Sequence, residues 1–340
     1  GPAGYGWEVV SGSWSGPQIG LQADNLNSDK NDIEGWLTLD SAEALFAGAG
    51  LNYQQLKATA AQPGFTAVPL GDVTASVAIQ NSVRTSLSQN VIAMISGTDR
   101  AEETIIYTAH WDHLGVTAEI PGDNIYNGAA DNATGTAALL AMAKMHVDAG
   151  PAPRSIVFLA VTAEESGLLG SRWYTEHPVF PLATTVANIN IDVLNTYGPM
   201  HDIVVVGNGS SELEAYLEEA ATAQGRHLVE EPNPERGYYY RSDHFNFAKA
   251  GVPALYAESG EDSVEFGKKW GAEQAQDYNE NRYHAPSDEY DPNWNLEGAA
   301  QDILLYFDVA SKLSRESSFP NWLEGNEFKG IRDATSASRP

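Results

Sequence analysis

From about residue 73 onward, short apolar segments rich in β-branched residues alternate with helical patterns, and this alternation constrains the fold more than any other feature. The strands are expected at 104–109, 155–162, 185–192, 203–206 and 252–256, and the helices at 134–149, 168–176, 211–223, 242–250 and 296–313. Alternation of this kind predicts a three-layer α/β fold, in which helices cover both faces of a mixed, mostly parallel sheet. Ligands then bind beyond the carboxyl ends of the strands.

The N-terminal part of the chain differs from the rest in composition and in its pattern of apolar residues. Residues 1–38 are rich in Gly, Ser, Asn and Trp, and the strand-like pieces 19–22 and 33–37 indicate a small, irregular β segment. A helix is expected over 41–61, and alternating apolar residues at 73–79 and 90–95 suggest a hairpin. We therefore expect four parts: an irregular β segment at 1–38, a helical connector at 39–72, the α/β domain at 73–320 and a C-terminal tail at 321–340.

Charge and cysteine content narrow the possible partners. The chain has 46 acidic side chains against 19 lysines and arginines, a formal net charge of -27. Such a surface repels phosphate backbones and anionic lipid, so nucleic acid is not an expected partner, whereas a salty habitat, cationic substrates or bound metal cations would each fit. No apolar run is long enough to span a membrane, and residues 1–10 do not read as a secretory signal. Because the chain contains no Cys, any metal must be held by His, Asp and Glu.

The segment most suggestive of chemistry is Thr108-Ala-His-Trp-Asp-His-Leu-Gly115, directly after an expected strand. His110 and Asp112 are two residues apart, so they project to the same side of an extended chain. A ligating histidine usually donates its other ring N–H to a carboxylate, and Asp112 could accept it through a short backbone bend. A strand-end histidine beside a solvated aspartate explains the pair equally well, and His113 is expected to be structural.

Four further motifs follow other expected strands. Asp131 lies at a strand-to-helix corner, where an aspartate is more often a helix N-cap than a ligand. Glu164 and Glu165 are adjacent acids at a strand end, which repel each other unless a cation or a shared proton compensates. A solvated helix start is the alternative explanation for them. Asp192 ends another apolar strand, and His284 lies in a Pro-containing loop.

Taken together, these motifs indicate a metal centre. The side chains that could hold metal all fall at expected strand ends or in the loops that follow: His110, Asp131, Glu165, Asp192 and His284. A two-metal site needs about this set, which is one histidine and one carboxylate for each ion and a further carboxylate that bridges the ions. The sequence has no phosphate-binding glycine motif and no Gly-x-Ser-x-Gly of a serine hydrolase.

In this order, the motifs His-x-Asp, Asp-Asn-x-x-Gly, Glu-Glu-x-Gly-x-x-Gly-Ser, a strand-terminal Asp and Tyr-His-x-x-x-Asp resemble those of the co-catalytic zinc exopeptidases of the M28 aminopeptidase family. The resemblance covers about residues 75–316. It implies two zinc ions bridged by Asp131, with the other ligands in two pairs, His110 with Asp192 and Glu165 with His284. It also implies that the peptide bond between Asp131 and Asn132 is cis.

The resemblance assigns further roles. Glu164 matches the family's general base, and Asp112 matches the partner of the first histidine. Two tyrosines match positions that stabilise the substrate carbonyl oxygen: Tyr239, as in related aminopeptidases, or Tyr283, as in the carboxypeptidase-like branch. Family members with a disulfide beside this loop have Cys where this chain has Arg241, so the rigidity of the loop must come from elsewhere.

The segments Tyr5-Gly-Trp-Glu-Val-Val and Trp14-Ser-Gly-Pro-Gln resemble the trailing half of the protease-associated domain that is inserted in many M28 members. The leading half of that domain is absent. Residues 1–38 are therefore expected to be a remnant of it, and residues 73–320 to be the zinc peptidase domain. By the same analogy, a periplasmic or secreted location is expected.

The implied activity is removal of N-terminal amino acids from peptides that carry a free α-amine. A carboxypeptidase or a dipeptidase of the same family is the main alternative. A glutaminyl cyclase-type acyltransferase with a single zinc and a non-catalytic, receptor-like module are less favoured, because the metal-binding set is complete. Imidazole and carboxylate ligands also suit cobalt or manganese, so the sequence does not identify the native metal.

Overall fold

The structure, a computed structural model, describes residues 33–117 and 121–339, together with residues 7, 10, 11, 17–22, 28 and 31. The chain forms two compact units that meet in sequence between Leu87 and Ser88, and residues 17–21 belong to the second unit. This boundary lies later in the chain than the one expected near residue 72. Most of the segment that resembles a protease-associated domain lies outside the described residues.

Between residues 39 and 60 the first unit has two helices where one, over 41–61, was expected. Helix α2 spans Leu39–Gly48 and helix α3 spans Tyr53–Ala60. The break follows from the caps, because the side chain of Asn52 accepts a hydrogen bond from the amide of Gln55 and so begins a new helix. Gly50, with φ of 73°, supplies the left-handed turn between the two helices.

The expected strands in the N-terminal part are wrong. Residues 19–22, 33–37 and 73–79 form no strand, and many of their apolar side chains are exposed, as at Ile33 and Ile79. The hairpin between 73–79 and 90–95 is also wrong, because Val91–Ile95 pairs instead with a strand near residue 157, far along the chain. Alternation in the sequence indicates strand propensity, but it does not identify the pairing partner.

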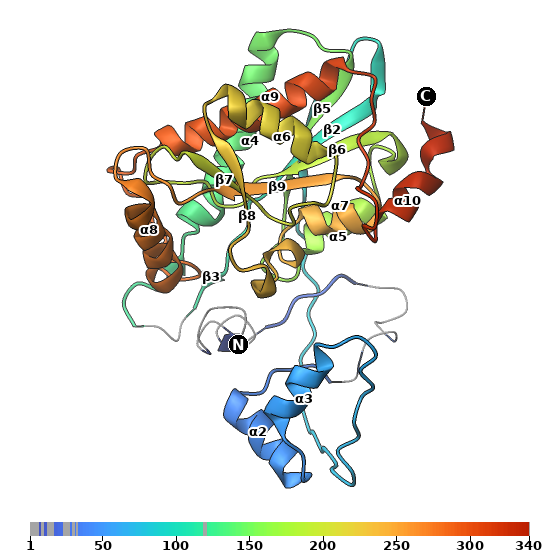
Figure 1. The fold of residues 1–340 in the computed structure, drawn as a ribbon, viewed down its shortest axis with the longest axis vertical. Helices are drawn as coiled ribbons and strands as arrows, with labels where there is room; N and C mark the ends of the chain where they lie inside the picture. Colours follow the sequence, from blue (N-terminus) through green and yellow to red (C-terminus); the bar gives the residue numbers. More distant parts are fainter. Residues whose placement is uncertain are drawn as a thin grey trace. The chain divides into compact units, whose positions relative to one another are not determined.

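The second unit is built on a sheet of 7 strands in the order β1-β5-β2-β6-β9-β7-β8 (Figure 1). The strands span Val91–Ile95 (β1), Arg100–His110 (β2), Arg154–Val161 (β5), Thr185–Asn190 (β6), Asp202–Val205 (β7), His227–Glu230 (β8) and Ala254–Ser259 (β9). Strands β5, β2, β6 and β9 run parallel to one another. Strand β1 is antiparallel to its neighbour β5, and β7 is antiparallel to its neighbour β9. The predicted mixed, mostly parallel sheet is confirmed.

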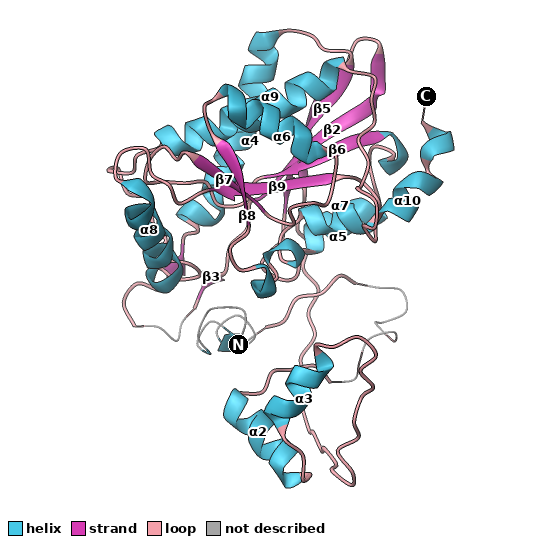
Figure 2. Ribbon diagram, in the orientation of Figure 1, coloured by secondary structure: helices cyan, strands magenta, loops and turns pink. Residues whose placement is uncertain are grey.

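Helices cover both faces of this sheet, as predicted (Figure 2). One face carries α4 (Thr134–Ala149), α6 (Leu213–Ala223) and α9 (Glu297–Arg315), and the other carries α5 (Leu169–Glu176) and α7 (His244–Lys249). Helix α4 has the predicted bounds. The elements that the sequence did not predict are polar or short: helix α8 (Gly267–Asn281), strand β8, and the strand pair β3 (Gly115–Val116) and β4 (Ile125–Tyr126).

The core is divided between the two faces by the alternation of side chains along β2. Ile105 and Tyr107 pack with the helices α4 and α9, whereas Ile106 packs on the opposite face with Phe247 of α7. All four side chains are fully buried. Burial of each aliphatic side chain of this size contributes about 1.5–3 kcal/mol, so the central strands are held firmly and provide a rigid base for the loops at their ends.

The segment expected to be a C-terminal tail is instead part of the second unit. Trp322 is buried, and its ring N–H donates to the carbonyl of Gly251 at 3.1 Å. Arg332, on helix α10 (Lys329–Ala334), is also buried and donates to the carbonyls of Thr185 and Val186 at the start of β6. Large buried side chains with satisfied donors are features of a core and not of a tail.

Among the described helices, none has both the length and the apolar character needed to cross a lipid bilayer.

Candidate active site

The carboxyl ends of β2, β5 and β6 lie side by side and determine where the predicted site residues fall. His110, the last residue of β2, is level with Val161 of β5, and Thr108 is level with Asn190 of β6. Glu164 and Glu165 follow β5 by a few residues, and Asp192 follows β6. The parallel register therefore brings three separate motifs to one edge of the sheet.

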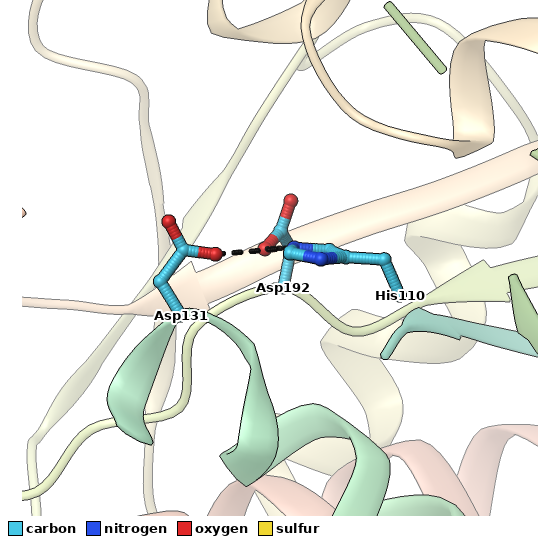
Figure 3. A group of neighbouring side chains, drawn as sticks. All are labelled: His110, Asp131 and Asp192. Atoms are coloured by element: carbon cyan, nitrogen blue, oxygen red, sulfur yellow. Dashed lines mark hydrogen bonds and ion pairs between the residues drawn. The ribbon is translucent and has the colours of Figure 1, made fainter. Parts of the chain in front are cut away.

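Two carboxylates approach the same ring nitrogen of His110 (Figure 3). Its Nε2 is 3.1 Å from Oδ1 of Asp131 and 3.2 Å from Oδ1 of Asp192. Asp131 reaches the ring from the turn before α4, and Asp192 reaches it from the loop after β6. His110 and Asp131 are almost completely buried, at 1% and 4% exposure.

A second imidazole lies on the other side of Asp131. Nε2 of His284 is 3.4 Å from Oδ2 of Asp131 and 3.1 Å from Oε2 of Glu165. Asp131 therefore contacts both histidines, one with each of its oxygens. The structure brings all five predicted ligands together, in the two pairs that the family resemblance implied.

Among the described residues, four that are not glycine have positive φ: Ala163 (55°), Leu168 (59°), Val193 (55°) and His284 (55°). A side chain in the left-handed region costs free energy and persists only where the surrounding structure demands it. Ala163 precedes Glu164, and Val193 follows Asp192. The strained positions therefore flank the side chains that converge on the site.

The turn that carries Asp131 is fixed by Asp288, the last residue of the Tyr-His-x-x-x-Asp motif, to which the sequence assigned no role. The carboxylate of Asp288 accepts from the amide of Ala130 at 2.9 Å and from the amide of Asp131 at 3.0 Å. The Asp131–Asn132 peptide bond is cis, as the resemblance implied, and the side chain of Asn132 donates to the carbonyl of Ile191. The spacing between His284 and Asp288 was the available signal, because it places both in one loop.

Asp112 contacts His110 in a different way from the one expected. The backbone carbonyl of Asp112, and not its carboxylate, is 3.0 Å from Nδ1 of His110, whereas the nearer carboxylate oxygen is 3.9 Å away. The carboxylate instead accepts from the amides of Glu164 at 3.1 Å and of Glu165 at 3.4 Å. These two hydrogen bonds direct the Asp112 side chain toward the loop after β5 and not toward His110.

His113, expected to be structural, also belongs to the site. Its Nδ1 is 2.7 Å from Oε1 of Glu165, and its ring lies edge-on to the ring of His284 with centroids 5.8 Å apart. Glu165 is thus held between two imidazoles. His113, Asp131 and Glu165 place ligand atoms within 4.8 Å of one another, as do His110, Asp131 and Asp192.

A buried chain of hydrogen bonds leads from the sheet to Asp192. The hydroxyl of Ser242 donates to Oδ2 of Asp192 at 2.6 Å and accepts from the side-chain NH₂ group of Asn190 at 2.7 Å. Asn190 in turn accepts from the hydroxyl of Thr108 at 2.7 Å. One oxygen of Asp192 is therefore fixed by the protein, which leaves the other directed at His110.

The crowding of acids and imidazoles perturbs their pKa values. Burial alone would lower the pKa of His110, but the carboxylates of Asp192 and Glu164 raise it well above its usual value. In the same way, hydrogen bonds to Asp131 and Glu165 overcome burial and raise the pKa of His284 to about 9. Burial is the main reason that the pKa of Glu164 is raised, and the neighbouring Asp192 adds to it. Clusters of strongly perturbed groups are typical of functional sites.

The donor set fits a metal. Two ligands that are each about 2.0–2.2 Å from a tetrahedral zinc ion lie about 3.4 Å apart. The contacts within the two ligand groups are 3.1–3.4 Å, so their spacing is that of ligands around an ion. Nδ1 of His284 is buried and makes no hydrogen bond among the described residues.

The two candidate tyrosines lie in different surroundings. The ring of Tyr283 stacks on the ring of His284, with centroids 3.9 Å apart, and its pKa is raised by burial and by Asp131. Tyr239 packs against Gly207 and against the ring of His244. Among the described residues, no hydrogen bond, ion pair or ring contact joins Tyr239 to a predicted ligand. The geometry thus favours Tyr283.

The sequence has recognisable relatives. It is 29% identical over 203 residues to Aminopeptidase YwaD of Bacillus subtilis, across 59% of this chain and 39% of that protein. It is 32% identical over 176 residues to Aminopeptidase NAALADL1 of Mus musculus, across 48% of this chain and 21% of that protein. The chain thus matches less than half of the length of either relative.

Solved structures share the fold. The LapA aminopeptidase of Legionella pneumophila matches with a TM-score of 0.51 at 21% identity, across 67% of this chain and 56% of that one. BSAP, a zinc aminopeptidase from Bacillus subtilis, matches with a TM-score of 0.50 at 24% identity, across 70% of this chain and 53% of that one. The sequence also matches the description of peptidase family M28 over residues 90–308. Because this match covers more than half of a chain whose site residues converge as the family's motifs require, the chain belongs to peptidase family M28.

Proposed function

We propose that this protein is a zinc-dependent aminopeptidase that removes N-terminal residues from peptides. The observation that carries the proposal is the position of Asp131, whose two oxygens face His110 and His284 separately, as a carboxylate that bridges two ions would. Relatives named as aminopeptidases, and a fold shared with a zinc aminopeptidase, support the same activity.

In this proposal the ions are held in two pairs of protein ligands joined by the bridging carboxylate: His110 with Asp192, and Glu165 with His284. When bound, two zinc ions would lower the pKa of a water molecule and polarise the scissile carbonyl. Ser242 orients Asp192 through its 2.6 Å hydrogen bond, and His113 orients Glu165 at 2.7 Å. Partners of this kind hold ligands in a fixed direction and raise metal affinity.

Glu164 is the proposed general base. It is buried, it lies beside the predicted ligands, and its pKa is raised, first by burial and then by neighbouring carboxylates. A carboxylate whose proton affinity is raised accepts a proton from the attacking water more readily, and it can then deliver that proton to the leaving amine. The Asp112 carboxylate holds the backbone amide of Glu164 and so keeps the base in position.

The test is product analysis by mass spectrometry after incubation of the zinc-loaded protein with one peptide in free, N-acetylated and C-amidated forms. We expect stepwise loss of residues from the N-terminus, blocked by acetylation and unaffected by amidation. Loss from the C-terminus, blocked by amidation, would instead assign a carboxypeptidase. Absence of cleavage in every form would contradict a peptidase function for this chain.

The number of ions has a separate test. Wild-type protein is expected to bind two zinc ions per chain, measured by elemental analysis after removal of free metal. Asp131→Ala is expected to lose zinc as well as activity, because both ions depend on this carboxylate. An unchanged zinc content in Asp131→Ala would refute the bridging role, and one ion per wild-type chain would refute the two-metal site.

A further inference from the structure

The phenol of Tyr283 is held from two sides. Its ring stacks on the imidazole of His284 with an interplanar angle of 21°. Its hydroxyl oxygen accepts a hydrogen bond from Nη2 of Arg241 at 3.1 Å. Tyr283 and Arg241 come from loops 42 residues apart in sequence, so this contact is a product of the tertiary structure.

The chemistry of the guanidinium group determines the direction of this hydrogen bond. Arginine has donors and no acceptor, so the phenol oxygen must accept, and the phenol proton points elsewhere. Within the described part of the chain, no hydrogen bond takes that proton. The hydroxyl of Tyr283 is therefore left as a hydrogen-bond donor, on a ring that stacks on His284.

Arg241 is itself anchored. Its guanidinium lies over the ring of Tyr238, 5.2 Å from the centroid, which is within the range of a cation–π contact. The next residue, Ser242, donates to Asp192. The segment 238–242 thus reaches both halves of the site, Asp192 through Ser242 and the Tyr283–His284 stack through Arg241.

We propose that Arg241 is a positioning residue, which fixes the phenol of Tyr283 as a hydrogen-bond donor to the substrate carbonyl oxygen as that oxygen gains negative charge. This inference rests on the proposed peptidase function. A hydrogen bond from a charged group to the phenol oxygen strengthens the phenol as a donor, and a preorganised donor of this kind stabilises a developing oxyanion. The rival explanation is that Arg241 only stabilises its loop.

The experiment compares Arg241→Met, Tyr283→Phe and the double variant. Loss of one oxyanion donor typically costs about 100- to 1,000-fold in kcat, and we expect Arg241→Met to cost about 10- to 100-fold with little change in KM. In the Tyr283→Phe background, Arg241→Met should add less than about threefold, because the hydroxyl on which it acts is already absent. Zinc content and the melting temperature should stay close to wild type.

A second readout does not depend on turnover. Binding of an aminoalkyl phosphonate, whose anionic oxygens imitate the oxyanion, is measured by calorimetry on the zinc-loaded protein. Arg241→Met should weaken phosphonate binding by about the same factor as kcat, and should leave binding of the corresponding free amino acid nearly unchanged. The control is Arg282→Met, which removes the same charge next to Tyr283 but pairs with Asp277 and not with the phenol.

The outcomes separate the two explanations. The inference would be overturned if the loss of kcat in the double variant equalled the product of the losses in the two single variants. It would also be overturned if Arg241→Met and Arg282→Met lost kcat and phosphonate affinity to the same extent. If Arg241→Met does not fold, Arg241→Lys, which keeps a charged donor, replaces it. The kcat of Arg241→Lys should lie between those of wild type and Tyr283→Phe, and a kcat equal to that of Tyr283→Phe would count against the inference. If wild type cleaves no peptide, the proposed function fails, and phosphonate binding still tests the coupling.

Discussion

Burial acts on single titratable side chains of this protein in opposite directions, according to the charge that each would carry. It raises the pKa of Glu164, because the charged form of a carboxyl loses its hydration. It lowers the pKa of His146 to about 4, because the charged form of an imidazole loses its hydration too. The first group lies in the site and the second packs in the core against Phe158 and Phe307.

Glu164→Gln should separate chemistry from metal binding. The amide cannot take a proton, so we expect kcat to fall by at least about a hundredfold while both zinc ions remain. Its neighbour provides the matched control, since Glu165→Gln should lose zinc together with activity. Kinetics and zinc content are measured on the same preparations. A Glu164→Gln variant with near-normal turnover would remove the residue from the role of base.

His146 should make stability depend on pH. Its pKa is lowered to about 4 in the folded protein, from a usual 6.5, so the unfolded chain gains a proton first as the pH falls. The free energy of unfolding should therefore fall between pH 6.5 and about 4, by up to about 3 kcal/mol from this group.

The difference between wild type and His146→Gln in urea unfolding at several pH values measures this contribution. The variant should show a shallower loss of stability below pH 6.5, whereas the exposed His177→Gln should behave as wild type does. Parallel pH profiles for wild type and His146→Gln would contradict the prediction.

At the scale of elements, the site depends on how loops are joined to one another rather than on any one helix or strand. The turn before α4, which carries Asp131, is fixed by Asp288 from the loop after α8. The loop after β5, which carries Glu164, is fixed by Asp112 from the loop after β2. Each of these carboxylates accepts two backbone N–H groups, so it orders a neighbouring loop.

Asp288→Asn should loosen the turn that carries Asp131. The amide keeps one acceptor but presents its NH₂ group to a backbone N–H, which leaves a buried donor unsatisfied at a cost of about 1–3 kcal/mol. We expect weaker zinc binding, measured by competition with a chelator, and a lower melting temperature. Glu289→Gln, at an exposed neighbouring carboxylate, is the control. Equal zinc affinity in Asp288→Asn and wild type would exclude this role.

At the scale of the whole molecule, the chain divides into two units, and the first unit ends at Leu87 in a segment without regular structure. Residues 73–90 form neither helix nor strand, and residues 73–89 are exposed. The second unit, by contrast, contains the whole sheet, both core clusters and every predicted ligand.

Limited digestion with trypsin should cut first after Arg84, because an exposed segment without regular structure fits a protease more easily than a folded one does. The product should be a resistant fragment that begins at Thr85, detected by mass spectrometry. Arg84→Gln should abolish this cut. Arg172, which is in helix α5 and pairs with Glu176, should stay intact in the same digest. An early cut at Arg172 would contradict the division of the chain.

Much of the second unit follows from local patterns. Helix α4 begins and ends where the apolar periodicity and Gly150 indicate, and β2, β5 and β6 lie within a few residues of their predicted places. Three of the predicted ligands also follow from this pattern, because His110, Glu165 and Asp192 stand at or just after the ends of β2, β5 and β6, and the ends of parallel strands share one edge. Asp131 and His284, which lie before α4 and after α8, were indicated by the family resemblance. These features depend on residues close together in the chain.

Other features depend on contacts between residues far apart. The partner of β1 is β5 and not the adjacent segment 73–79, since a strand pairs where its side chains can be buried. The Asp112 carboxylate faces the loop after β5, His113 contacts Glu165, and Trp322 enters the core, none of which a local pattern contains.

The amino-acid sequence therefore predicted the fold class, most elements of the second unit and five of the residues that could hold metal, though not His113. The tertiary structure decided which side chains orient that set, and it favoured Tyr283 over Tyr239. The physical reason is that propensity and periodicity act over a few neighbouring residues. The direction of a carboxylate or a phenol is set instead by hydrogen bonds that only the folded chain can make.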